Sequence, residues 1–290
     1  MVSRILVAGA GLMGSSLAKC LSSKKIEVYV YNRSVEKARA LCSEVECSVV
    51  ENLGGLRDID AAVMFLFDDN AVLDFTRMLI SNGSLKEIKL LVNSSTISPE
   101  TSLTLYEVVK NNGGVYVESP VYGSTDEASS CNLISMLAGD EEARLIAERT
   151  ASLYSSRVFW VGRVPKAMAL KLSLNNIGLS MPAVLAESLI LLDLYNVDVK
   201  IFEDIASTLW FGSIIKRYLE RAERTGGKPR FTVAGAAKDY RVISYTLLAK
   251  GKHPLISHAI AGFYDLAARV SPGEDYPRAI SLYRKLTGVR

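Results

Sequence analysis

The sequence is poor in the residues that build metal centres and disulfide scaffolds, with four cysteines and two histidines in 290 residues. The cysteines form no Cys-x-x-Cys pair and have no adjacent histidine, so we expect no metal site. Such usage is typical of a reducing compartment, and we expect a cytoplasmic location, although Cys42 and Cys47 could pair in an oxidising one. His253 and His258 miss the i, i+4 spacing of paired helical ligands, and we expect neither to be catalytic.

Strong charge and long apolar runs are also missing. Lys and Arg number 34 against 31 Asp and Glu, without a basic block, so nucleic acid is not an expected partner. Pro182 and Glu187 interrupt the longest apolar stretch, 177–192, which therefore predicts a buried helix rather than a membrane span. A strand pattern follows Met1 directly, so we expect a soluble protein with no signal peptide.

What the sequence does contain is two different hydrophobic patterns. Up to about Val161, short β-rich runs alternate with helical stretches, which predicts a parallel sheet covered by helices. After Gly162 the apolar period becomes 3.6 residues, which predicts helices as far as about Thr287. We therefore predict an α/β domain over residues 1–162 and an all-helical substrate and oligomerisation domain over residues 163–290. The strands are predicted at 5–8, 28–31, 62–66, 90–92, 115–117, 133–137 and 158–161.

A glycine-rich turn, Gly9-Ala-Gly11-Leu12-Met13-Gly14, follows the first predicted strand and opens a helix. Gly9 allows the tight turn, Gly11 lets the backbone approach a pyrophosphate, and Gly14 lets helix and strand pack closely. The first helical residues, Leu12 and Met13, then present free amides to the anion. This placement predicts a Rossmann dinucleotide-binding domain; the alternative is a glycine turn in an unrelated α/β protein.

The end of the second strand predicts which dinucleotide is bound. An NAD enzyme of this type usually has Asp or Glu there, whose carboxylate binds the ribose hydroxyls and repels a 2′-phosphate. This sequence has Asn32, followed by Arg33 and Ser34, which supply a guanidinium and a hydroxyl for that phosphate. We therefore expect NADP(H), with an exposed loop charge as the alternative role for Arg33.

In the helical half, Lys171 and Asn175 are spaced i, i+4 and share one helix face. The neighbours of Lys171 are mostly apolar, and burial among them would lower the pKa of the lysine toward the range useful for proton transfer. Taken alone, such a lysine is more often a side chain that reaches out to solvent.

These motifs together resemble the β-hydroxyacid dehydrogenase family, which includes 3-hydroxyisobutyrate dehydrogenases and the glyoxylate and succinic semialdehyde reductases. The resemblance covers the whole chain. It rests on Gly9–Gly14, Asn32–Ser34, Asn93–Thr96 with Pro99, Glu118–Gly123, Lys171–Asn176, and Phe231 with Lys238-Asp239.

The resemblance implies a role for each matching residue. Lys171 would exchange a proton with the substrate oxygen, and Asn175 would position the substrate. Thr96 would lie on the nicotinamide side and Lys238 would close over the cofactor, with Asp239 orienting or capping. The alternatives are that Thr96 only begins a helix and that Lys238-Asp239 is an exposed helix pair.

The segment Tyr122-Gly123-Ser124 matches the substrate loop of the family, which usually reads Ser-Gly-Gly there. Tyr122 would either donate a hydrogen bond to the substrate or shrink the pocket. Pro165 and Ala167 replace two glycines that usually precede the lysine, which stiffens this segment.

The resemblance implies an NADP-dependent reductase of a small semialdehyde or glyoxylate, or the reverse oxidation of a 3-hydroxy acid, with Lys171 as general acid and base. The alternatives are an imine reductase and a catalytically silent NADP-binding module. The helix starting near Val164 is apolar on more than one face, so we expect a homodimer or homotetramer.

Overall fold

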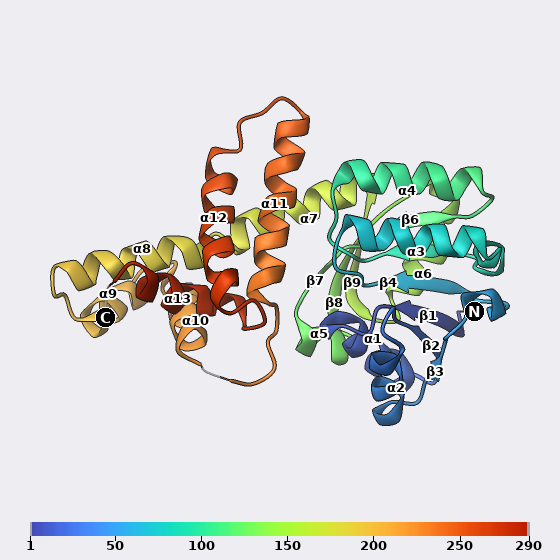
Figure 1. The fold of residues 1–290 in the computed structure, drawn as a ribbon, viewed down its shortest axis with the longest axis horizontal. Coiled ribbons are helices and arrows are strands. Elements are labelled where there is room, and N and C mark those ends of the chain that lie inside the picture. The colour runs from blue at the N-terminus through green and yellow to red at the C-terminus, as the bar shows by residue number, and fades with distance from the viewer. Residues whose placement is uncertain (1, 225, 289–290) are drawn as a thin grey trace. The chain divides into compact units, whose positions relative to one another are not determined.

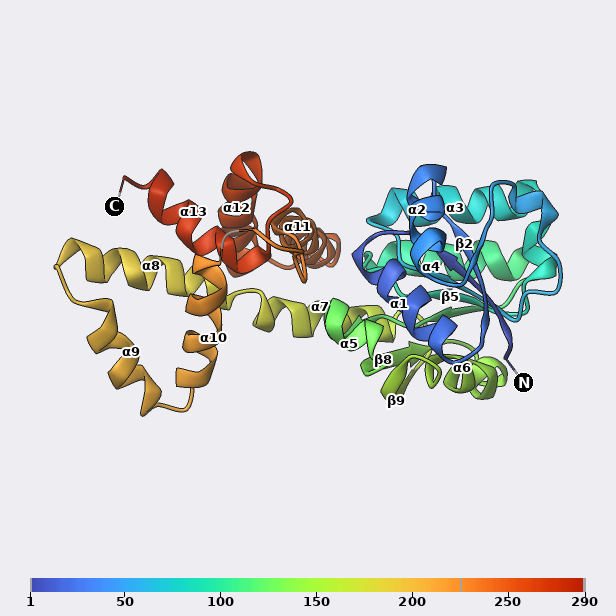
Figure 2. The same ribbon diagram turned by 90° about the horizontal axis from the view of Figure 1, so that it is seen from below.

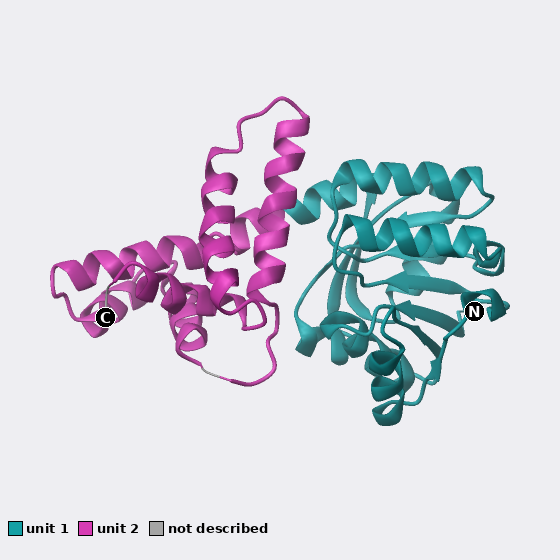
Figure 3. Cartoon of the chain, viewed as in Figure 1, with its two compact units in different colours: residues 1–172 teal, residues 173–290 magenta. Residues whose placement is uncertain are grey.

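The computed structural model describes residues 2–224 and 226–288, which form two compact units (Figure 3). The units are Met1–Leu172 and Ser173–Arg290. The division falls inside helix α7 (Lys166–Gly178), whereas the sequence placed the domain boundary at Gly162, the last residue of strand β9 (Ser155–Gly162).

The first unit is built on one mostly parallel sheet (Figure 1). In the described part of the chain it has nine strands in the order β3-β2-β1-β4-β5-β6-β8-β7, and β9 pairs with β8. β8 runs antiparallel to β6 and β7. The other strands are β1 (Arg4–Ala8), β2 (Glu27–Tyr31), β3 (Ser48–Val49), β4 (Ala61–Met64), β5 (Leu91–Asn93), β6 (Tyr116–Glu118), β7 (Val121–Tyr122) and β8 (Leu133–Ala138). The predicted α/β fold class is confirmed.

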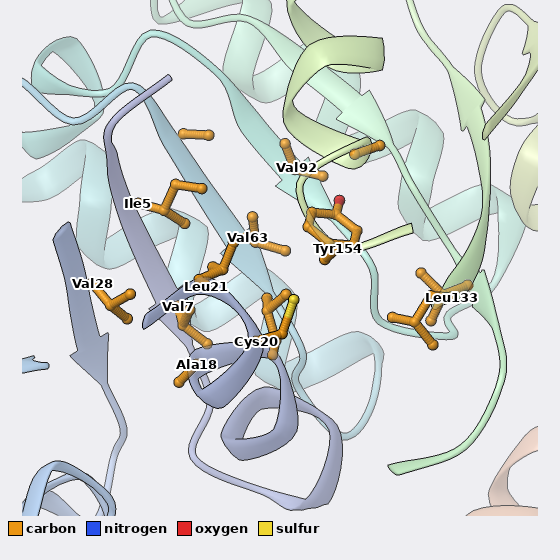
Figure 4. Packing of buried hydrophobic residues seen from close by; sticks show 14 of the residues in the cluster. Ile5, Val7, Ala18, Cys20, Leu21, Val28, Val63, Val92, Leu133 and Tyr154 are labelled. Atoms are coloured by element: carbon orange, nitrogen blue, oxygen red, sulfur yellow. The ribbon is translucent and has the colours of Figure 1, made fainter. Parts of the chain in front are cut away.

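Both faces of this sheet are covered by helices, which explains why its central strand is apolar throughout. In β1, Ile5 and Val7 belong to a core cluster with residues of α1, α2 and α6, while Leu6 and Ala8 belong to a second cluster with residues of α3 and α4. Figure 4 shows the first of these clusters. The helices are α1 (Leu12–Ser23), α2 (Val35–Glu44), α3 (Asp69–Ser81), α4 (Pro99–Asn111), α5 (Thr125–Ser129) and α6 (Arg144–Ala151). Such two-sided burial is characteristic of parallel sheets.

All seven predicted strands are present, and the structure adds β3 and β7. Each added strand has two residues, too few for a period of two to be recognised in the sequence. Val121 and Tyr122 of β7 pair with β8, a strand that begins more than ten residues later in the sequence. Tertiary pairing rather than local pattern therefore forms both.

Among its described residues, the second unit contains helices and no strand longer than a single bridge, as predicted (Figure 2). Its helices are α8 (Met181–Leu194), α9 (Val199–Ser207), α10 (Gly212–Glu223), α11 (Val233–Ala249), α12 (Leu255–Val270) and α13 (Ala279–Leu286). Helices α11 and α12 pack through Tyr240 and Tyr264, whose stacked rings lie 5.9 Å apart. The buried Tyr264 hydroxyl donates to the carbonyl of Leu179 at 2.8 Å, so this aromatic core also anchors the residues before α8.

The apolar stretch at the start of the helical half is mostly exposed. By length and composition Lys166–Leu194 could cross a membrane, and its most apolar part is 28% buried. Pro182, Leu185 and Leu189 face the interior, while Val184 and Leu191 are 60% and 57% exposed. The prediction of a buried helix is therefore wrong for the single chain, because α8 has apolar side chains on two faces and the unit covers one.

The structure pairs all four cysteines, which lie within its described residues. Cys42 and Cys47 form the pair that the sequence left open, and Cys20 in α1 bonds to Cys131 just after α5. The second pairing joins residues 111 positions apart, so no sequence spacing could indicate it. The cysteines therefore do not argue for a reducing compartment, and the cytoplasmic location stays a prediction.

A buried carboxylate holds the amino end of the central strand. Asp60 accepts hydrogen bonds from the amides of Ser3 and Arg4 at 2.8 and 3.1 Å, and Lys89 lies 2.7 Å away. Burial alone would raise the pKa of this carboxyl, but the hydrogen bonds from Lys89 and the two amides outweigh it and lower the pKa to about 2. The folded state therefore favours the ionised form.

We expect Asp60→Asn to lower the free energy of unfolding by about 1–2 kcal/mol at neutral pH, because the stabilisation from a depressed pKa is present above the unfolded value and is lost as the pH falls through the folded one. Urea unfolding between pH 7 and pH 2 measures this. The wild-type protein should lose the stabilisation that Asp60 provides below about pH 4. The variant should lack this stabilisation at every pH. Equal stability of both proteins at pH 7 would contradict the assignment.

Candidate active site

The glycine turn between β1 and α1 has the geometry of a pyrophosphate cradle. Gly9 has φ +110°, and a Cβ there would lie 2.3 Å from the carbonyl oxygen of Phe65. A Cβ on Gly14 would lie 1.8 Å from the carbonyl oxygen of Gly9, so the helix can begin here only with glycine at both positions. A Cβ on Gly11 would meet no atom within 4 Å, which leaves open space beside the backbone. The turn fits a dinucleotide phosphate.

Asn32, after the end of β2, braces this turn. Its Oδ1 accepts a hydrogen bond from the Ala10 amide at 3.0 Å, and its Nδ2 donates to the carbonyl of Ser34 at 2.8 Å. Both polar ends of the side chain are therefore bonded within the protein. The sequence placed Asn32 among the cofactor-binding residues, and the structure shows that it shapes the turn that would bind the cofactor.

Arg33 and Ser34 differ in how their side chains are engaged. Arg33 is exposed at the end of β2. The Ser34 hydroxyl donates to the Glu36 carboxylate at 3.0 Å. The pKa of Glu36 is lowered by its own backbone hydrogen bond and by Ser34, so the group stays ionised. Of the two side chains proposed for a 2′-phosphate, the guanidinium is the stronger candidate.

The turn after β5 is fixed by Ser95. The Ser95 hydroxyl bonds to the carbonyl of Met64 and the amide of Leu66, and the Ser95 amide donates to Oδ1 of Asn93 at 3.0 Å. Thr96 follows this anchored residue and is half-buried. The residue that caps α4 is Ser98, whose hydroxyl accepts from the Thr101 amide, so beginning the helix is not the role of Thr96.

The predicted substrate loop begins at Tyr122, the last residue of β7. Gly123 has φ +131°, and a Cβ there would lie 2.7 Å from Leu133, so glycine is required. The amide of Ser124 donates to the Glu127 carboxylate at 2.7 Å, and its hydroxyl bonds to the same oxygen. Ser124 therefore begins α5 with a capping box, a local role that the sequence did not assign to it.

Lys171 lies on α7 against the ring of Tyr122. The lysine Nζ is 5.0 Å from the ring centroid, within the range of a cation–π interaction. The sequence offered two roles for Tyr122, a hydrogen bond to substrate or a smaller pocket, and the structure adds this contact with the lysine. Lys171 is half-buried, and the buried residues next to it are Ala167, Met168 and Leu172.

In the second unit, Asn175 belongs to a buried polar cluster with two residues of α11. Its Nδ2 donates to Oδ2 of Asp239 at 2.6 Å, and Nζ of Lys238 lies 2.5 Å from Oδ1 of Asp239. Their exposed fractions are 7% for Asn175, 8% for Lys238 and 1% for Asp239, so an exposed helix pair is ruled out. Asp239 holds the other two side chains in place.

Sequence reasoning gave no role to Glu118, the last residue of β6. Its side chain is fully buried, and Oε2 accepts from the amides of Ala167 and Met168 at 3.0 and 3.3 Å. Burial raises the pKa of this carboxyl to about 7, although hydrogen bonding from Ser102 and the amides of Met168 and Ala167 opposes the shift. The feature of the sequence that could have indicated a role for Glu118 is a carboxylate at the end of an apolar strand, where a charged side chain is rarely buried without a reason.

The fold and the glycine turn define a dinucleotide-binding protein with a Rossmann domain. The family described as the NAD binding domain of 6-phosphogluconate dehydrogenase matches residues 4–162. The chain belongs to this family, and its resemblance to the β-hydroxyacid dehydrogenases is confirmed.

Known proteins resemble the chain over most of its length. An uncharacterized oxidoreductase, YfjR of Bacillus subtilis, is 30% identical over 74% of this chain and 76% of that protein. Glyoxylate/succinic semialdehyde reductase 1 of Arabidopsis thaliana is 31% identical over 64% of each chain. A structure of Mycobacterium tuberculosis 3-hydroxyisobutyrate dehydrogenase with L-serine superposes on 98% of this chain and 100% of that chain, with a TM-score of 0.82. The sequence identity is 18%, so this similarity shows the shared fold.

Proposed function

We propose that the protein is an NADP-dependent oxidoreductase that reduces a small semialdehyde or glyoxylate, or oxidises the corresponding hydroxy acid. The observation that carries this proposal is Lys171, a half-buried lysine that faces Tyr122 in the segment matching the substrate loop of the family. The glyoxylate/succinic semialdehyde reductase among the relatives supports the substrate class. A carbonyl acid of this size offers one oxygen for protonation and one carboxylate for anchoring.

A bound nicotinamide would supply the hydride, and the residues of the protein would supply the proton and the orientation. Lys171 in its ammonium form donates a proton to the carbonyl oxygen, and in its neutral form accepts one from a hydroxyl. One hydrogen of Asn175 Nδ2 is bonded to Asp239, and the other hydrogen or the Oδ1 of Asn175 would orient a substrate hydroxyl. The amides at the start of α1 would bind the pyrophosphate, and Arg33 the 2′-phosphate.

We expect Lys171→Ala to lower kcat by roughly 10²–10⁴-fold, the usual contribution of general acid catalysis, with NADPH affinity largely retained. The measurement is NADPH oxidation with glyoxylate, succinic semialdehyde, methylmalonate semialdehyde and a cyclic imine, alongside NADPH binding by fluorescence. Lys166→Ala is the matched control, because Lys166 is an exposed lysine in the first turn of the same helix.

The substrate panel separates the proposal from its rivals. Reduction of an aldehyde acid that depends on Lys171 supports the proposal. Reduction of the imine alone identifies an imine reductase. Tight NADPH binding without turnover of any substrate by wild type favours a silent cofactor-binding module.

We expect Arg33→Ala to raise KM for NADPH by about 10–100-fold and to change KM for NADH little, because a charged hydrogen bond to phosphate is lost. Steady-state kinetics with each cofactor measure the difference. Arg39→Ala is the control, since Arg39 lies on the neighbouring α2 and is paired with Glu51. Equal losses with both cofactors would mean that Arg33 does not recognise the 2′-phosphate.

We further propose that the protein is a homodimer or homotetramer. In the second unit, Ile201 and Ile205 of α9 are 55% and 60% exposed, and Trp210 is 84% exposed. Leu191 and Leu194 near the end of α8 are also more than half exposed. An apolar surface of this kind marks an interface, and a second copy of the chain is the partner that is always present.

We expect Ile205→Glu to lower the mass of the assembly measured by light scattering at micromolar concentration, because a charge would be buried at the interface. Glu203→Gln, an exposed substitution on the same helix, should leave the mass unchanged. A monomeric wild type at this concentration would refute the proposal.

A further inference from the structure

Two buried carboxylates in the first unit accept hydrogen bonds from backbone amides, and they lie at opposite ends of the strands, Asp60 at the amino ends and Glu118 at the carboxyl ends. Asp60 precedes β4 and binds the amides at the start of β1. Glu118 ends β6 and binds two amides of α7. Asp60 is neutralised by Lys89, whereas the Glu118 atom Oε1 is buried without a hydrogen-bond partner in the described part of the chain. Burying the Glu118 carboxyl with an oxygen that has no partner costs stability. This carboxyl lies beside the helix that carries Lys171.

The position of the two amides explains what Glu118 holds. The amides of the first helical turn have no acceptor within the helix, and the first i, i−4 bond of α7 runs from Ala169 to Pro165. Glu118 therefore takes the place of an N-cap side chain, supplied by a strand almost fifty residues earlier in the sequence. The amino end of a helix also favours a negative group at this point.

Lys171 follows Ala167 by four residues and thus lies on the same face of α7, about 6 Å further along the axis. The segment after Glu118 contacts that face a second time, through the Tyr122 ring and Nζ of Lys171. The β6–β7 segment therefore contacts α7 at its first turn and again at the lysine.

Glu118 also belongs to a polar network that reaches the turn carrying Thr96. The hydroxyl of Tyr116 bonds to Ser102 at 2.8 Å and accepts from Nδ2 of Asn93 at 3.2 Å. Ser102 also lies near Glu118 and helps to lower the pKa of that carboxyl. Burial raises the pKa of Tyr116, and negative charge on Glu118 raises it further, so the two groups lie close together. Through Asn93 the network reaches the Ser95 amide next to Thr96. The turn carrying Thr96, the segment carrying Tyr122 and the helix carrying Lys171 thus share one buried anchor.

We propose that Glu118 is a positioning residue of the reaction, which holds the first turn of α7 and thereby sets the place of Lys171. This proposal rests on the proposed function of Lys171. Displacement of a reacting group by about 1 Å can lower the rate on the order of 100-fold, so loss of this anchor should reduce kcat rather than cofactor binding.

The test compares Glu118→Leu, which removes the acceptor, with Glu118→Gln, which keeps a carbonyl oxygen in its place. We expect Glu118→Leu to lower kcat on the order of 100-fold with KM for NADPH changed less than about threefold. Glu118→Gln should retain kcat within about fivefold, because a neutral acceptor still binds both amides. Asp60→Asn is the matched control, because it changes a buried carboxylate at the amino ends of the strands. This variant should have lower stability and unchanged kcat.

Amide hydrogen exchange of the peptide 163–172 provides a readout that needs no turnover. Glu118→Leu should accelerate exchange there and alter the rate at which an amine-reactive reagent labels Lys171, while Asp60→Asn should do neither. If wild type reduces no substrate, these two measurements still test the anchor, so failure of the function and failure of the inference are distinguishable.

Unchanged exchange and labelling in Glu118→Leu would overturn the inference. So would a loss of kcat in folded Glu118→Gln as large as the loss expected for the leucine variant. If Glu118→Leu does not fold, retention of both turnover and slow exchange by Glu118→Gln supports the anchor, and loss of either refutes it.

Discussion

The close packing of α1 against the end of β1 is the contact on which the rest of the first unit depends. Gly14 lies so near Gly9 that no side chain fits between them, and this contact allows the helix to begin directly after the strand. Because α1 begins there, its first amides lie at the carboxyl edge of the sheet, next to the open space beside Gly11. Asn32 completes the turn from the neighbouring strand. A cofactor site follows from this packing without any dedicated charged residue in the turn.

The other candidate residues of the first unit lie after strands of the same sheet. Thr96 follows β5, and Tyr122 closes β7, which itself follows β6 after a short turn. Each of these turns is fixed by buried hydrogen bonds rather than by apolar packing alone, as at Ser95 and Ser119. Rigid polar anchors of this kind hold functional side chains in defined positions.

The sequence predicted the fold class and the strands with enough residues to show a pattern. Val7, Val30 and Val63 lie side by side in three strands, so their apolar runs could be recognised one by one. The pairing of Cys20 with Cys131 and the two-residue strand β7 could not, since both depend on contacts between distant residues. A hydrophobic pattern in the sequence reveals which residues are buried, whereas the pairing of distant strands or cysteines is seen only in the folded chain.

For the candidate site, the sequence suggests residue types but not what those residues bond to. The choice of Asn32 as a cofactor ligand followed from its place at a strand end, and its bond to Ala10 depends on the geometry of the turn. Ser124 was expected to meet substrate, but Glu127, three residues later, takes its hydroxyl in a capping box. Glu118 had no assigned role because its partners, Ala167 and Met168, are far away in the sequence.

The bond between Cys20 and Cys131 turns part of the chain into a closed covalent loop. This loop starts in the helix that follows the glycine turn, passes through β2 to β7, and returns just beyond α5. A protease that cuts one peptide bond inside the loop therefore cannot separate the cofactor turn from the segment carrying Tyr122. The two pieces stay joined through sulfur, so damage to an exposed turn of the first unit leaves a single molecule.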